Sequence, residues 1–88
     1  MADIRKSESG ETLFCITMNM PARSGNMTHM IMAAAPGIKT AEEFAEFLDG
    51  KDFVIVEEHY RREGDGDYFS VGPICLNVMY IGKVKACA

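Results

Sequence analysis

The clearest signal in this sequence is one amphipathic helix, and most of the remaining chain is patterned for strands. Thr40 and Glu43 form a capping box, in which a hydroxyl and a carboxylate three residues apart satisfy free N–H groups at a helix start. After them, apolar residues recur three and four positions apart, and Gly50 suits the position that follows the last turn. We therefore predict an N-cap at Thr40 and a helix over Ala41–Asp49.

Several segments have strand patterns. In residues 12–20, Phe14, Ile16, Met18 and Met20 alternate with the other residues, as in a strand with one face on the core. Residues 52–62 begin with a β-branched and aromatic run that is typical of a central strand, and we expect them to leave the core from Glu57 onward. We predict further strands over 68–71, 74–76 and 80–85, with a bulge at Gly82.

Residues 27–35 fit two structures. Methionine and alanine favour a helix, and Asn26 is a suitable cap for one. The short Ser24–Asn26 connection to the preceding strand favours a hairpin instead. We favour the strand but leave both structures open.

The predicted fold class is α+β: a mainly antiparallel sheet of four to five strands with one amphipathic helix packed on a face, in the order β-β-α-β-β. We expect residues 1–11 to form a flexible N-terminal arm and residues 12–88 to form one domain. Because one helix covers only part of such a sheet, we expect another surface, such as a second subunit, to cover the rest.

Composition argues against several classes of function. The chain has 88 residues and a net charge of −4, and its basic residues are scattered, so we expect no nucleic-acid partner. No apolar run approaches the ~20 residues that span a bilayer, so we expect no membrane partner. Three cysteines and a polar start without an apolar signal segment indicate a reducing compartment, which we take to be the cytoplasm.

No residue pattern points to catalysis, a metal or a cofactor. The cysteines Cys15, Cys75 and Cys87 and the histidines His29 and His59 do not have the spacing of a zinc site. We expect the cysteines to lie in the core, where a thiol is poorly reactive, and the histidines to lie on the surface. The acidic segment 63–67 is interpreted as a tight turn. We therefore predict that the chain is not an enzyme.

The turn after the first strand is a candidate ligand site. A guanidinium, a hydroxyl and an amide beside a glycine have the chemistry that holds a phosphate or a carboxylate. The candidate residues for a small anionic ligand or a nucleotide are Arg23, Ser24, Asn26 and His29.

Methionines are unusually frequent around the same turn. The chain has seven methionines and no tryptophan. Because methionine side chains adapt to irregular surfaces, a subunit interface is predicted at Met18, Met20, Met30 and Met32. We expect a non-enzymatic interaction protein that acts as a homodimer, such as an inhibitor, adaptor or regulatory protein of the kind that phages and mobile elements encode. The alternative is the small-ligand protein.

Overall fold

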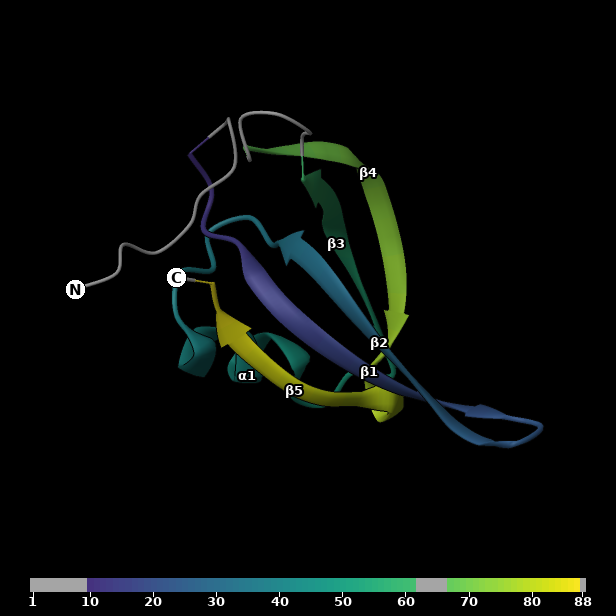
Figure 1. Ribbon diagram of the computed structural model, residues 1–88. Helices are drawn as coiled ribbons and strands as arrows, with labels where there is room; N and C mark the ends of the chain where they lie inside the picture. Colours follow the sequence, from purple (N-terminus) through teal and green to yellow (C-terminus); the bar gives the residue numbers. More distant parts are fainter. Residues whose placement is uncertain (1–9, 62–66, 88) are drawn as a thin grey trace.

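The computed structural model describes residues 10–61 and 67–87. Five strands form one antiparallel sheet in the order β4-β3-β2-β1-β5 (Figure 1). The elements in chain order are β1 (Phe14–Ala22), β2 (Gly25–Ala34), α1 (Ala41–Leu48), β3 (Phe53–Arg61), β4 (Tyr68–Asn77), the 3-10 helix η1 (Val78–Tyr80) and β5 (Ile81–Ala86). The predicted α+β class with a single helix is confirmed, and the order is β-β-α-β-β-β.

The hairpin interpretation of residues 27–35 is confirmed. β1 and β2 pair along their whole length, from Phe14 opposite Ala33 to Ala22 opposite Gly25. Only Arg23 and Ser24 lie between the strands, and this leaves no room for a helix after the turn. Gly25 has a φ of +119°, which only glycine adopts without strain.

The helix α1 begins as the capping box predicts. The Glu43 backbone N–H donates to Thr40 Oγ1 at 3.1 Å, and the Thr40 N–H donates to Glu43 Oε1 at 3.1 Å. The helix ends at Leu48, and Asp49, predicted as its last residue, is instead the C-cap. Phe44 is fully buried, and its ring centroid lies 4.9 Å from that of Phe14, so α1 is attached to the sheet by aromatic packing.

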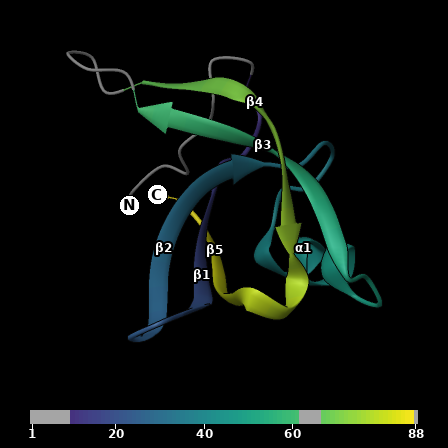
Figure 2. The same ribbon diagram turned by 90° about the vertical axis from the view of Figure 1, so that its right-hand side faces the viewer.

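The sheet is strongly curved, and its concave face holds the main core (Figure 2). β2 and β3 pair at only three positions, where Met32–Ala34 lie opposite Glu57–His59, and then diverge. Beyond this point β1 and β2 continue together and project from the sheet (Figure 1). We call this projecting part, residues 19–28, the arm.

The convex face carries a second, smaller cluster. Its buried members are Leu13, Cys15, Ala34 and Cys87. The expectation of core cysteines holds for Cys15 and Cys87 but is wrong for Cys75, which is exposed because it points away from the core on β4, one position before buried Leu76.

His59 also differs from the prediction of surface histidines. It is 2% exposed, because it lies opposite Met32, which packs against the convex cluster. The expectation that β3 leaves the core after Val56 is therefore wrong at this position.

The later strands follow the predicted positions with local differences. The bulge at Gly82 is confirmed, because Thr17 pairs with Lys83 and Met18 pairs with Ile81. The two predicted short strands over 68–71 and 74–76 form one strand, β4, with a register shift against β3. The predicted N-terminal arm and the 63–67 turn lie largely outside the described residues. Within the described part of the chain, no helix is long and apolar enough to cross a membrane.

Candidate interaction surface

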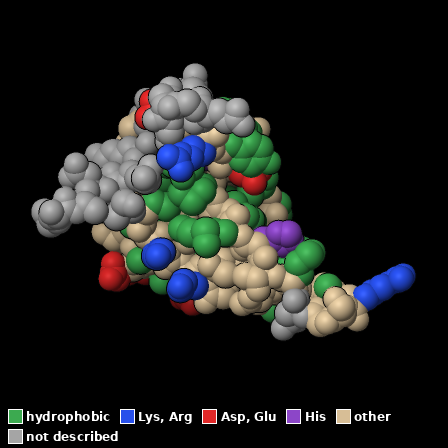
Figure 3. All heavy atoms as spheres, viewed as in Figure 1, with side chains coloured by type: hydrophobic (Ala, Val, Ile, Leu, Met, Phe, Trp, Pro, Cys, Tyr) green, Lys and Arg blue, Asp and Glu red, His purple; other side chains and the backbone are tan. Residues whose placement is uncertain are grey.

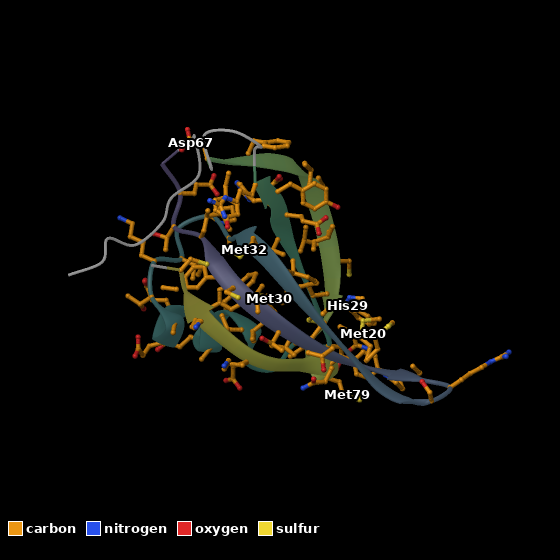
Figure 4. All side chains as sticks on the ribbon, in the orientation of Figure 1. Met20, His29, Met30, Met32, Asp67 and Met79 are labelled. Carbon is orange, nitrogen blue, oxygen red and sulfur yellow. The ribbon has the colours of Figure 1, made fainter. Side chains whose placement is uncertain are left out.

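The open end of the concave face contains a groove of about 650 Å³. Its walls come from the base of the arm on one side and from β3, β4 and η1 on the other. Most of the side chains in it are apolar, and they include Met18, Met20, Ile31, Tyr60, Ile74 and Tyr80. Figure 4 shows Met20 and His29 next to each other where the arm leaves the sheet. The groove is the part of the concave face that α1 does not cover.

Large apolar side chains are exposed around this groove. Met30 is 71% exposed and Tyr60 is 55% exposed, and both line the groove. Met20 and Phe53 also line it and are exposed. Exposed apolar surface around a groove is typical of an interaction site. The space-filling view faces the convex side of the sheet, with α1 behind it, and shows hydrophobic side chains reaching the surface there as well (Figure 3).

The groove contains one carboxylate, that of Glu58. Its side chain shares a face with Ala33, opposite which it lies, and it is half-buried. No described side chain forms an ion pair with it. A partly buried charge without a counter-charge is better stabilised when a cation approaches, so the groove favours a basic group over an anion.

The structure separates the residues predicted to bind an anion. Arg23 and Ser24 are exposed in the turn at the end of the arm, whereas His29 lies opposite Met18 and lines the groove. From Gly25 to His29 the strand rises about 13 Å. The side chain of Asn26 is not described. Figure 3 shows a basic side chain projecting from the end of the arm.

The predicted interface methionines divide between the two faces. Met18 and Met20 line the groove from the concave face, and Met18 is buried there. Met30 borders the groove, but it lies two residues before Met32 on β2, so its side chain shares the convex face with that of Met32. Met32 packs against the convex cluster, where the Cys87 thiol donates to its Sδ at 3.8 Å. Sequence patterns missed Tyr60 and Glu58, although both have the same alternation as Val54 and Val56 on β3.

The backbone of β2 presents unpaired groups along the arm. The Cys87 backbone N–H donates to Leu13 O, immediately before β1. Because the backbone groups of successive residues in a strand point to opposite sides, the odd-numbered residues of β1 direct their N–H and C=O groups toward β5. The even-numbered residues of β1 direct theirs toward β2. Because the register pairs even residues of β1 with odd residues of β2, the even residues of β2 face away from β1. On the same reasoning, the backbone of Pro21 in β1 faces away from β2.

The outward-facing residues of β2 along the uncovered Gly25–Ile31 edge are Asn26, Thr28 and Met30. Each has a backbone N–H and a backbone C=O on this edge. β3 covers the edge only from Met32 onward, and no other described strand pairs with Gly25–Ile31 on this side. Thr28 Oγ1 donates to Asn19 Oδ1 of β1 at 3.1 Å, which ties the two strands of the arm together. The edge is therefore unpartnered among the described residues.

The other two edges of the sheet have features that block strand addition. On β4 the edge contains Pro73 and a register shift, and on β5 it contains the Gly82 bulge and two exposed lysines, Lys83 and Lys85. Prolines, bulges and lysines are the usual means by which proteins protect an edge strand. The Gly25–Ile31 edge has no proline, no bulge and no Lys, Arg, Asp or Glu.

His59 is the one buried histidine among the described residues. Its Nδ1 lies 3.1 Å from Glu57 O, and its Nε2 has no hydrogen-bond partner. Across residues 10–61 and 67–87, no three His, Cys, Asp or Glu side chains are grouped closely enough to hold a metal ion.

Comparison of the chain with protein-family models, curated proteins and solved structures finds no match. The function therefore has to be inferred from the geometry of the chain itself.

Proposed function

We propose that this chain is a protein–protein interaction module that catalyses no reaction and assembles with a second copy of itself. The observation that carries the proposal is the uncovered end of the concave face, where an apolar groove of about 650 Å³ adjoins the exposed side chains of Met30 and Tyr60. An inhibitor, adaptor or regulatory subunit uses a folded surface of this kind.

Burial of this apolar surface drives the proposed association. Each Å² of apolar surface that leaves water contributes roughly 25 cal/mol to the free energy of association. A chain of this size buries a comparatively small fraction of its surface in its own core. A second copy supplies the same apolar side chains in return, as in a symmetric interface where one patch contacts itself. The association therefore buries the part of the concave face that α1, with only eight residues, leaves uncovered.

The alternative, a small anionic ligand, has weaker support. The groove volume lies within the roughly 300–1,000 Å³ of small-molecule sites. However, the carboxylate of Glu58 lines the groove and repels an anion, and Arg23 lies at the far end of the arm. The geometry thus supports a macromolecular contact better than an anion site.

The test is the mass of the native protein in solution, measured by light scattering over a range of concentrations. We expect twice the chain mass of 9.7 kDa, with dissociation on dilution. Met20→Glu places a charge in the groove and is expected to weaken association. Met79→Glu is the matched control, because Met79 is 78% exposed and does not line the groove. A single-chain mass at every concentration would contradict the proposal.

A further inference from the structure

We infer that the two copies join by pairing their β2 edges antiparallel, about a two-fold axis that passes beside Thr28. This inference rests on the proposed self-association and specifies how it occurs. It assigns the unpartnered Gly25–Ile31 edge to a second copy and gives each residue of that edge a defined neighbour.

The edge is self-complementary. Its outward-facing residues, Asn26, Thr28 and Met30, are spaced evenly around Thr28. When two such edges run antiparallel, Thr28 faces the partner's Thr28, and Asn26 faces the partner's Met30. Each outward residue exchanges one N–H and one C=O, so the pairing forms about six inter-chain hydrogen bonds. The two sheets then become one continuous sheet.

The same register determines where the turn of the arm lies. Gly25 comes opposite the partner's Ile31. The next position along the partner's β2 is Met32, and that position is already occupied by the partner's His59. The Arg23–Ser24 turn therefore stops at the start of the partner's β2–β3 pairing, next to the partner's Glu58.

The charges at this meeting point are opposite. Arg23 is exposed at the end of the arm, and Glu58 is half-buried in the groove without an ion-pair partner among the described residues. A guanidinium binds a carboxylate with directional, charge-assisted hydrogen bonds, which gain strength as water is excluded. In a two-fold dimer the pair forms twice, once at each end of the shared edge.

Charge reversal tests this arrangement in trans. Arg23→Glu and Glu58→Arg each place like charges at both ends of the interface, so each variant alone is expected to dissociate at least about 100-fold more readily than the parent chain. When the two variants are mixed, every contact between a Glu58→Arg chain and an Arg23→Glu chain joins opposite charges. The mixture is therefore expected to form a one-to-one heterodimer, which native mass spectrometry detects if one chain carries a heavy-isotope label.

A backbone substitution gives a second, independent test. Thr28→Pro removes the outward-facing N–H at the centre of the edge without removing a bond to β1, and proline is tolerated on an edge strand. We expect a monomer with an unchanged far-ultraviolet circular dichroism spectrum. Thr28→Val is the matched control, since it loses the same hydroxyl and keeps the N–H, and we expect it to remain a dimer.

The outcomes separate the two proposals. A parent chain that dimerises, while the mixed variants gain nothing and Thr28→Pro remains dimeric, overturns the edge pairing and leaves the proposed function standing. A parent chain that is monomeric at every concentration overturns both. If Thr28→Pro does not fold, the charge-reversal mixture still decides the question.

Discussion

The two ends of the concave face are built from the same strands but have opposite surroundings. At the end beneath α1, Phe14, Ile16 and Phe44 are fully buried. At the other end, Tyr60 is more than half exposed. The cause is length: a helix of eight residues is about 12 Å long, whereas a strand of ten residues extends about 33 Å. One end of the face therefore stabilises the fold, and the other remains available for binding.

The largest expected effect lies at the covered end. Phe44→Ala removes a fully buried ring that contacts Phe14, and it should lower the free energy of unfolding by about 3–5 kcal/mol in urea denaturation. Phe53→Ala is the control at the open end, where the side chain is 60% exposed, and it should cost less than about 1 kcal/mol. Equal losses for the two variants would mean that the ends do not differ as described.

A smaller effect is expected at the start of the helix that covers this end. Thr40→Ala removes the acceptor for the Glu43 N–H, so unfolding free energy should fall by about 1 kcal/mol. Thr40→Ser keeps the hydroxyl and should behave almost like the parent chain. A Thr40→Ala variant with an unchanged thermal midpoint would show that the cap contributes nothing to the cover of the core.

The smallest effect on stability is expected at the open end. Tyr60→Ala should change the free energy of unfolding of the dilute monomer by less than about 0.5 kcal/mol, because its side chain is 55% exposed. The same change should weaken self-association, as measured by sedimentation equilibrium, because Tyr60 lines the groove. Tyr60→Phe, which keeps the ring, is the control. A loss of stability without a loss of association would assign Tyr60 to the core instead.

Much of the fold could be predicted because its signals are local. The capping box at Thr40 and Glu43 needs only a few neighbouring residues, and the structure contains it. The alternation in residues 12–20 and the short turn after it were sufficient to favour the hairpin. The mistaken burial of Cys75 and exposure of His59 came from treating short apolar and charged runs as uniform, whereas a strand alternates its faces at every residue.

The candidate surface was less predictable, because it depends on where strands stop pairing. Met18, Met20, Met30 and His29 were named from the sequence, and the structure places all four along the groove. Nothing local in the sequence of β2 indicates that β3 leaves it after three positions. This divergence depends on the curvature of the whole sheet, and it creates both the groove and the unpaired edge. The role of these residues as an interface remains a prediction.

Pro21 limits how far the proposed assembly grows. Its ring nitrogen has no hydrogen to donate, and it occupies the border of the arm that lies away from β2. A third copy that added a strand along this edge of β1 would lack one backbone hydrogen-bond donor, in a stretch of only a few residues. The arm can therefore pair with another strand along the β2 edge only, and this favours a closed dimer over an open-ended fibre.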